Sequence, residues 1–287
     1  MIRTSVLVHL VRAPAALTVP GDPLTGAVAA GLPLRGRWLA LPAASVALYW
    51  AGMALNDYAD RALDAVERPE RPIPSGRISP GQALAVAGGL TVAGLGLAVV
   101  GGGRDAVRIA MPLVGMIWAY DVWLKHTPAG PVAMAACRGL DVLLGAGWRA
   151  RRRGLPAAAA LAAHTLGVTA LSRGEVHGGS RATAAAAIAC STLAGLATLI
   201  GPAHSPGHRA AAALAAAGFA ALVVPRQVAA AQQLSAPAVR AATVAGIHGM
   251  MLLQSALAVR QGAALGAVLV AAALPVTRKL GRAVSPT

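Results

Sequence analysis

Three oxygen-bearing side chains recur at every fourth position near the end of an apolar segment: Asn56, Asp60 and Asp64. On an α-helix, residues four apart are rotated by only about 40° around the axis, so these side chains would form one stripe. Asp57 would point about 100° away from Asn56, and we rank it below the other three. Oxygen ligands that leave coordination positions open suit Mg²⁺ shared with a phosphate. The spacing therefore predicts a Mg²⁺ site.

Two arginines, Arg68 and Arg71, follow this stripe, and five of the chain's 10 acidic residues lie between residues 57 and 70. A guanidinium group can donate two parallel hydrogen bonds to phosphate oxygens. We therefore expect a diphosphate ligand, held by Mg²⁺ and by arginine. The simpler alternative is that these charged side chains pair with each other and solvate a helix end. The regular spacing and the cost of carboxylates at a membrane edge favour the functional interpretation.

The elements that must position these residues are apolar helices. The chain has 287 residues, of which 56% are hydrophobic and 12% charged, and its apolar runs are too long and too numerous for one soluble core. Most approach the ~20 residues with which a helix crosses a bilayer. Ten segments can be delimited: 5–31, 38–56, 81–101, 105–124, 131–148, 155–172, 181–202, 209–229, 239–258 and 262–279. The sequence predicts an all-α, polytopic transmembrane helical bundle that forms one domain over residues 1–287.

The formal net charge of +15 comes from basic residues that are spread over many short loops. Because there is no basic domain and only 3% of the residues are aromatic, we expect no nucleic-acid partner. Arginines at segment ends instead mark the headgroup regions of a membrane. The face with the aspartates carries a modest excess of Lys and Arg, although the basic run at 149–153 opposes it. We expect a multi-pass protein of the bacterial cytoplasmic membrane, with the aspartates facing the cytoplasm.

Three polar connections fall on one face of the predicted bundle when the crossings are counted. They span residues 57–79, 125–131 and 172–180. Prolines within residues 69–80 forbid continuation of the preceding helix, and Ser79-Pro80 is typical of an N-cap followed by a first-turn proline. Loops that share a face can build one site, so we expect these three to converge.

The UbiA superfamily of intramembrane prenyltransferases has a first aspartate-rich motif that this chain resembles at Asn56-Asp57-x-x-Asp60-x-x-x-Asp64-x-x-x-Arg68-Pro69-x-Arg71-Pro72. The family's Tyr/Lys segment is similar to Tyr120-x-x-x-Leu124-Lys125-x-Thr127-Pro128. The resemblance implies a bundle of about nine spans around a central cavity open to lipid. Because this count is one below the ten segments, we expect a false split or a non-spanning helix within residues 209–280.

Carried over residue by residue, the resemblance implies that Asn56, Asp60 and Asp64 bind Mg²⁺. It also implies that Arg68 and Lys125 contact the diphosphate of a prenyl diphosphate donor. Asp60, Asp64 and Lys125 are then the candidate catalytic residues.

The activity that the resemblance implies is transfer of the prenyl group to a hydrophobic acceptor within membrane lipid. Metal and cationic side chains would stabilise the departing diphosphate as the allylic C–O bond ionises, and the acceptor would capture the carbocation. Arg71 is a further candidate for substrate binding. Tyr120 is a candidate for contact with the prenyl group, since aromatic faces attract cations.

The chain departs from the family at the second aspartate-rich motif, which normally follows the sixth span. That position here contains only one acidic residue, Glu175, flanked by Arg173 and His177. Either Glu175 and phosphate oxygens suffice for a second Mg²⁺, or Arg173 and His177 replace part of the missing metal's charge. The altered loop is also similar to that of a UbiA-like subgroup that includes EboC. Arg173 and Glu175 are therefore candidates for substrate binding.

Arg138 and Asp141 lie three residues apart in the fifth apolar segment. One interpretation is a buried ion pair on adjacent turns. The other is that Arg138 binds the diphosphate or Asp141 the acceptor, and we give both equal weight. Asp22, beside a break in the first segment, is interpreted most simply as a helix cap.

Two other functions stay open at this stage. A UbiA-like terpene cyclase would ionise a prenyl diphosphate and close rings without an acceptor. A non-catalytic protein for lipid or metabolite transport, or a scaffold, would keep the diphosphate or lipid site for binding alone.

Overall fold

The structure, a computed structural model, describes residues 3–284 and is all-helical over that range, which confirms the predicted fold class. The α-helices are α1 (Thr4–Leu10), α2 (Gly21–Ala29), α3 (Ala40–Ala59), α4 (Arg61–Glu67), α5 (Pro80–Val122), α6 (Gly130–Ser172), α7 (Arg181–Ala197), α8 (Pro206–Gln233), α9 (Ala236–Arg260) and α10 (Ala264–Val284). Short 3-10 helices are η1 (Ala13–Thr18), η2 (Gly36–Leu39) and η3 (Leu124–His126). The predicted first segment, 5–31, is thus broken into α1, η1 and α2.

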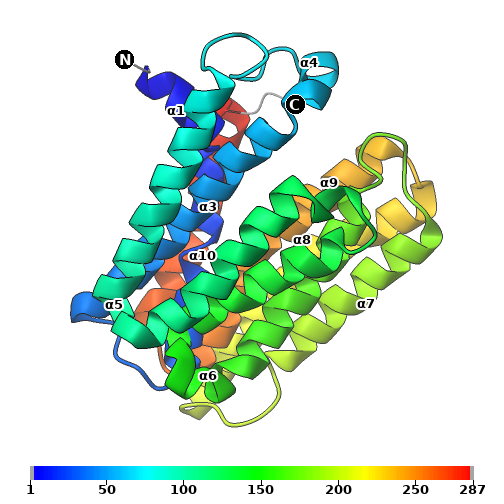
Figure 1. Cartoon of the computed structure of the whole chain (residues 1–287). Helices are drawn as coiled ribbons and strands as arrows, with labels where there is room; N and C mark the ends of the chain where they lie inside the picture. The colour runs from blue at the N-terminus through cyan, green and yellow to red at the C-terminus, as the bar shows by residue number, and fades with distance from the viewer. Residues whose placement is uncertain (1–2, 285–287) are drawn as a thin grey trace.

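The two longest helices each contain a sharp reversal at a glycine. Gly103 in α5 has φ 59° and ψ −146°, and Gly147 in α6 has φ 71° and ψ 167°. Positive φ values of this kind are accessible to glycine and costly for other residues. Each helix therefore makes two passes through the bundle (Figure 1), which confirms the predicted divisions between 81–101 and 105–124 and between 131–148 and 155–172.

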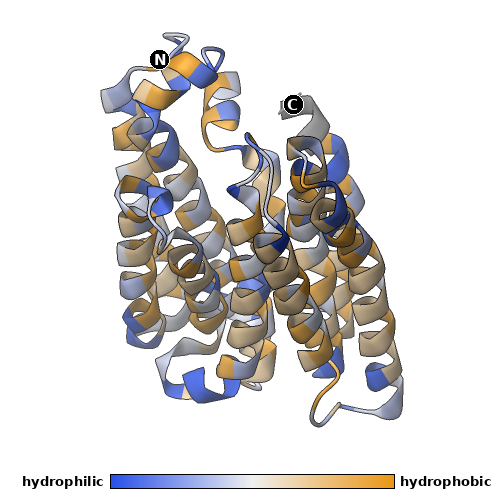
Figure 2. Ribbon diagram, turned by 90° about the vertical axis from the view of Figure 1, so that its right-hand side faces the viewer, coloured by the Kyte–Doolittle hydropathy of each residue, from blue (hydrophilic) through white to orange (hydrophobic). Residues whose placement is uncertain are grey.

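Five of the described helical segments are long and apolar enough to cross a membrane: Gly36–Ala59, Pro80–Val122, Gly130–Ser172, Pro206–Gln233 and Ala236–Arg260. Apolar residues run along the helices and hydrophilic ones gather toward their ends (Figure 2), and the chain is an integral membrane protein. The expected false split is wrong, because three separate helices occupy residues 206–284. The alternative of one non-spanning helix there stays a prediction.

The predicted boundary before α5 is confirmed in detail. The Ser79 hydroxyl accepts a hydrogen bond from the backbone N–H of Gln82 at 3.2 Å, and the Gln82 side chain accepts one from the Ser79 N–H at 3.0 Å. Pro80 occupies the first turn, where no intrahelical N–H partner is lost. This reciprocal cap fixes where the polar segment 68–79 ends and the apolar helix begins.

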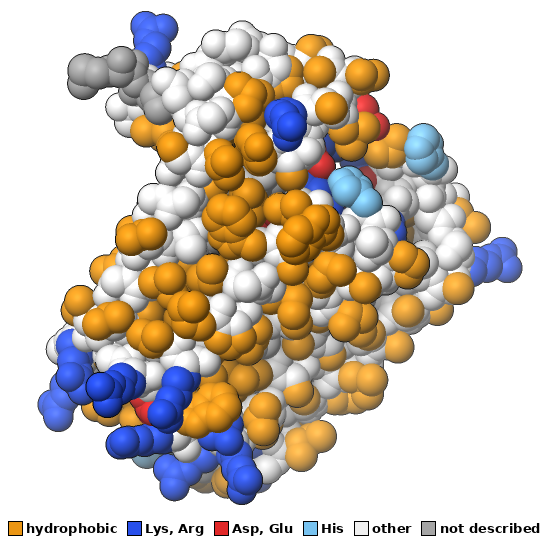
Figure 3. All heavy atoms as spheres, viewed as in Figure 1, with side chains coloured by type: hydrophobic (Ala, Val, Ile, Leu, Met, Phe, Trp, Pro, Cys, Tyr) orange, Lys and Arg blue, Asp and Glu red, His pale blue; other side chains and the backbone are white. Residues whose placement is uncertain are grey.

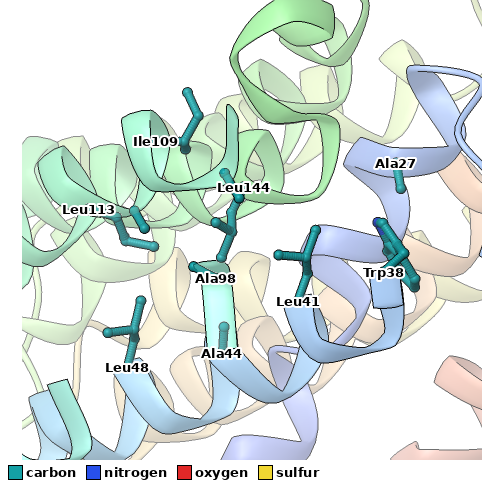
Figure 4. Close-up of a cluster of buried hydrophobic side chains, with 11 residues drawn as sticks. Ala27, Trp38, Leu41, Ala44, Leu48, Ala98, Ile109, Leu113 and Leu144 are labelled. Atoms are coloured by element: carbon teal, nitrogen blue, oxygen red, sulfur yellow. The ribbon is translucent and has the colours of Figure 1, made fainter. Parts of the chain in front are cut away.

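The core joins α2, α3, α5 and α6 through small and branched apolar side chains. A buried cluster contains Ala27, Trp38, Leu41, Ala44, Leu48, Ala98, Ile109, Leu113 and Leu144, drawn in Figure 4. Glycines let α2 lie backbone to backbone against α6: a Cβ atom at Gly26 would lie 1.8 Å from the Val142 carbonyl oxygen, and one at Gly145 would lie 1.8 Å from that of Pro23. This close approach carries the polar start of α2 into the middle of the bundle.

Candidate active site

The three polar connections meet at one end of the bundle, as the sequence predicts. Lys125 forms an ion pair with Asp60 at 2.8 Å, which joins the second connection to the first. Arg173 donates a hydrogen bond to the backbone oxygen of Thr127 at 3.0 Å, which joins the third connection to the second. Helix α4 lies at this end together with α1 and the last turns of α10 (Figure 1).

The predicted oxygen stripe crosses a helix junction. Helix α3 ends at Ala59 and α4 begins at Arg61, with Asp60 between them at ψ 4°. The backbone pattern nevertheless continues, since the N–H of Asp60 bonds to the Asn56 oxygen at 2.9 Å and that of Asp64 to the Asp60 oxygen at 2.8 Å. The three residues therefore belong to two helices and not to one. Asn56 and Asp60 contact Asp121 and Lys125, whereas Asp64 contacts Arg71.

Each carboxylate of the stripe has cationic neighbours. Asp60 is paired with Lys125 and also lies 3.1 Å from Nε2 of His126. Asp64 is 1% exposed, and its Oδ2 accepts a hydrogen bond from Arg71 at 2.9 Å. Its Oδ1 is buried and accepts no hydrogen bond, and the Arg68 guanidinium lies 3.7 Å away. The groups expected to hold a metal and those expected to hold a diphosphate are thus neighbours.

Asn56 is oriented by a residue that the sequence analysis missed. Its side-chain N–H donates to Oδ1 of Asp121 at 3.1 Å. Asp121 is buried, and it lies one turn before Lys125 in the Tyr/Lys segment. Its position one turn before Lys125 is the sequence feature that could have identified Asp121 as a site residue. The hydrogen bond leaves the Asn56 carbonyl oxygen as an acceptor or metal ligand.

Asp57, which we ranked below the other oxygen-bearing residues, has a structural environment of its own. It is 3% exposed and forms ion pairs with Arg12 at 2.9 Å and with Arg71 at 3.1 Å. Burial and the nearby Arg12 charge lower the pKa of the Arg71 guanidinium, while Asp57 and Asp64 partly offset this shift. Asp57 therefore holds Arg71 in place beside Asp64. The sequence analysis assigned no role to Arg12. The sequence feature that could have identified it is the presence of an arginine within the first apolar segment.

The oxygen donors fit a magnesium ion that shares its coordination with a phosphate. The described residues contain no group of three His, Cys, Asp or Glu side chains that could enclose a metal. They do offer Oδ1 of Asp64, which accepts no hydrogen bond, together with the carboxylate of Asp60 and the amide oxygen of Asn56. Mg²⁺ is commonly bound by one or two carboxylates, with phosphate and water oxygens completing the octahedron.

The altered second motif is joined to the Lys125 connection by Arg173, and Glu175 lies within range of the Arg68 charge. Arg240 donates a hydrogen bond to the Glu175 backbone oxygen at 2.6 Å. Burial raises the pKa of the Glu175 carboxyl, and a hydrogen bond from Thr243 and the charges of Arg240 and Arg68 oppose this shift. Arg173 is used to hold the neighbouring connection, and His177 is exposed. The connection 172–180 therefore contributes one half-buried carboxylate, that of Glu175, to the site.

Beneath the charged end, a cavity of about 100 Å³ lies between α3, α5 and α6. Tyr120 and Asp121 line it near the charged end, and Arg138 and Asp141 line it deeper in the bundle. Most of the remaining wall is apolar: Val19, Leu48, Met53, Leu113, Ile117, Met134 and Cys137. Asp121, which lines the cavity, accepts the hydrogen bond from Asn56, so the cavity begins next to the candidate diphosphate site.

At the deep end, Arg138 pairs with Asp22 and not with Asp141. Asp22 is fully buried and also accepts a hydrogen bond from Gln254 at 2.7 Å. Asp141 accepts one from the Ser45 hydroxyl at 2.5 Å, and its other oxygen is buried without a partner. The expected adjacent-turn ion pair and the expected helix cap at Asp22 are both wrong. The reason is the glycine contact that brings α2 against α6 and makes Asp22 the nearer carboxylate.

Comparison with known proteins gives consistent matches. The model of the UbiA prenyltransferase family matches residues 23–250. Digeranylgeranylglyceryl phosphate synthase of Methanopyrus kandleri is 38% identical over 124 residues, which cover 43% of this chain and 45% of the relative. The enzyme of that name from Methanospirillum hungatei is 44% identical over 78 residues, which cover 27% of this chain and 28% of the relative. The matched regions thus span less than half the length of these relatives.

Two solved structures share the fold. One, described as digeranylgeranylglyceryl phosphate synthase in membranes, superposes with a TM-score of 0.64 at 16% identity and covers 89% of this chain and 97% of its own. The other, an apo UbiA homolog from Aeropyrum pernix K1, has a TM-score of 0.67 at 17% identity and covers 84% of this chain and 96% of its own.

Proposed function

Because this chain belongs to the UbiA prenyltransferase family, we propose that it is a Mg²⁺-dependent intramembrane prenyltransferase. Its donor is a prenyl diphosphate and its acceptor a hydrophobic small molecule. The observation that carries the proposal is the row of Asp60, Asp64, Lys125, Arg68 and Arg71, which lies next to an apolar cavity through the Asn56–Asp121 hydrogen bond. Such a row offers metal ligands and phosphate ligands together, next to a space for a prenyl chain.

The donor's diphosphate is held by residues that neutralise its charge as it leaves. Asn56, Asp60 and Asp64 would hold Mg²⁺, which when bound supplies positive charge to the phosphate oxygens. Lys125 and Arg68 move from their aspartate partners to the diphosphate. Their charges are worth most in the transition state, when the C–O bond is breaking and negative charge grows on the leaving group.

Arg71 has a different task from these mobile cations. Its guanidinium bridges Asp57 and Asp64 at 3.1 Å and 2.9 Å, so it orients the Asp64 carboxylate and adds positive charge beside the phosphates. The third connection contributes Arg173, which anchors the Lys125 loop, and Glu175, which supports a second metal only with help from phosphate oxygens. We infer one strong metal site and one weak one.

The cavity binds the prenyl chain and shelters the carbocation. Tyr120 lines its upper part, where an aromatic face stabilises positive charge. The apolar wall keeps water away from the cation, which would otherwise be captured by it. Deeper in the cavity, Arg138 and Asp141 supply the polar groups that orient the acceptor. The relatives are named digeranylgeranylglyceryl phosphate synthase, so a geranylgeranyl diphosphate donor is the first probe to try.

The proposed orientation places this end of the bundle at the cytoplasmic side, as the excess of basic residues favours. The named relatives are archaeal, so assignment to a bacterial membrane stays a prediction.

The test is turnover of labelled geranylgeranyl diphosphate by protein in lipid nanodiscs, with a mixture of hydrophobic acceptors. Asp60→Asn and Asp64→Asn should each lower the rate by about 100-fold or more, because each removes a carboxylate that would hold the Mg²⁺ whose positive charge stabilises the leaving diphosphate. Glu67→Gln, which changes an exposed carboxylate in the same helix as Asp64, is the matched control and should retain the rate. Equal rates in all variants would reject the enzyme and favour a binding or transport protein. Ring products formed without acceptor would identify a cyclase.

A further inference from the structure

A second cavity lies at the end of the bundle opposite the active site. It has a volume of about 690 Å³ and is formed by the segment between α2 and α3 and by the reversals of α5 and α6. In Figure 3, Lys and Arg side chains gather at this lower end of the molecule, with an acidic side chain among them. The acidic, basic and histidine side chains of the active-site end occupy a separate hollow at the upper right.

Five arginines from three separate parts of the chain line this pocket. Arg35 and Arg37 come from the segment before α3, Arg104 and Arg108 from α5, and Arg149 from α6. Such convergence differs from a row of arginines along one helix end, because it requires the fold to bring like charges together. Like charges around one hollow repel each other unless an anion lies between them.

One carboxylate, that of Asp105, lines the pocket, and it already contacts Arg149. Asp105 accepts a hydrogen bond from the backbone N–H of Arg149 at 3.2 Å and lies 3.7 Å from its guanidinium. It thereby caps the second pass of α6 just after Gly147. Among the described residues, the other four guanidinium groups of the pocket form no ion pair with a carboxylate. A strong excess of positive charge therefore faces the hollow.

The rest of the pocket wall is apolar. It includes Leu32, Pro33, Trp38, Leu41 and Leu144. Leu32 and Pro33 are exposed, whereas Trp38, Leu41 and Leu144 are buried. Trp38 is held by a hydrogen bond from its indole N–H to the Gly145 oxygen at 3.4 Å. A free inorganic anion would use only the guanidinium groups. An amphipathic ligand would use both kinds of wall, with its anionic group on the arginines and its apolar part on Leu32 and Pro33.

We propose that this pocket binds the phosphate headgroup of an anionic membrane lipid, in the leaflet opposite the active site. The arginines hold the phosphate oxygens through paired N–H donors. The apolar wall lies where the acyl chains begin. A lipid held there would tie the reversals of α5 and α6 to the start of α3. The proposal does not depend on the prenyl transfer.

The test compares two double variants that remove the same charge from the same face. Arg104→Gln/Arg108→Gln removes pocket arginines, whereas Arg152→Gln/Arg153→Gln removes exposed arginines of α6 that do not line the pocket. Delipidated protein is mixed with phosphatidylglycerol or phosphatidylcholine, and bound lipid is counted by native mass spectrometry. Wild type and the Arg152/Arg153 variant should prefer phosphatidylglycerol, and the pocket variant should lose about tenfold or more of that affinity.

Two further measurements separate loss of lipid binding from misfolding and from binding of free phosphate. If the double variant does not fold, as judged by gel filtration and thermal unfolding, Arg37→Gln alone replaces it and should lose part of the preference. Inorganic phosphate added at a concentration equal to the lipid's should leave bound phosphatidylglycerol in place. The proposal is overturned if both double variants lose affinity equally, since this would reveal general surface attraction. It is also overturned if wild type shows no lipid preference, or if inorganic phosphate displaces the lipid.

Discussion

The buried pair of Arg138 and Asp22 supports a specific prediction about stability. Asp22 is 0% exposed, and besides Arg138 its side chain accepts a hydrogen bond from Gln254 and lies beside the Asp141 carboxyl. Replacing Arg138 with Met leaves a carboxylate in the bundle interior without its counter-charge. Breaking a buried pair on one side costs about 3–5 kcal/mol. We therefore expect Arg138→Met to lower the free energy of unfolding by at least about 3 kcal/mol.

The same reasoning predicts that the loss is largely recovered in a double variant. Asp22→Asn/Arg138→Met removes both charges and keeps an amide that Gln254 can still bind. Its unfolding free energy should lie closer to wild type than that of Arg138→Met, with a coupling energy of about 2 kcal/mol or more. The assay is equilibrium unfolding in mixed micelles, followed by circular dichroism. Additive effects within about 0.5 kcal/mol would refute the reasoning.

Three other predictions concern packing and the active site. Gly145→Ala should destabilise the protein by about 2 kcal/mol or more in the same unfolding assay, because its Cβ would lie 1.8 Å from a backbone oxygen. The control is Gly89→Ala, which has open space around its Cβ and should be neutral or stabilising. Asp121→Leu should weaken Mg²⁺ activation of turnover by about tenfold or more, because Asn56 loses the acceptor that orients it; an unchanged Mg²⁺ titration would contradict this. Lys125→Gln should lower kcat/KM for the diphosphate donor by about tenfold or more, as measured by initial rates, and a change in the acceptor KM alone would argue against its role.

Local signals in the sequence were sufficient for the elements and for the end of the bundle at which the site lies. Apolar runs of membrane-spanning length gave the helices, and glycine-rich breaks near residues 103 and 147 separated the passes of α5 and α6. Ser79-Pro80 marked a helix start through a cap that needs only neighbouring residues. Counting crossings placed three connections on one face, and the Lys125–Asp60 pair agrees with that count.

Contacts between distant segments could not be read in the same way. Arg138 is 116 residues from Asp22, and their pairing depends on how closely glycines allow α2 and α6 to approach. The Asn56–Asp121 hydrogen bond spans 65 residues and depends on the register between α3 and α5. The arginine pocket is assembled from three parts of the chain that appear in the sequence as ordinary segment ends. In each case tertiary packing decides which polar groups meet.

The most direct test of the central claim is the Mg²⁺ dependence of prenyl diphosphate binding. A non-hydrolysable thiodiphosphate analogue of the donor, titrated into wild type, Asp64→Ala and Glu175→Ala with and without Mg²⁺, gives this quantity by calorimetry. We expect Mg²⁺ to tighten binding to wild type by at least about tenfold, to have less effect on Glu175→Ala and to have none on Asp64→Ala. Identical Mg²⁺ titrations for wild type and Asp64→Ala would contradict the account.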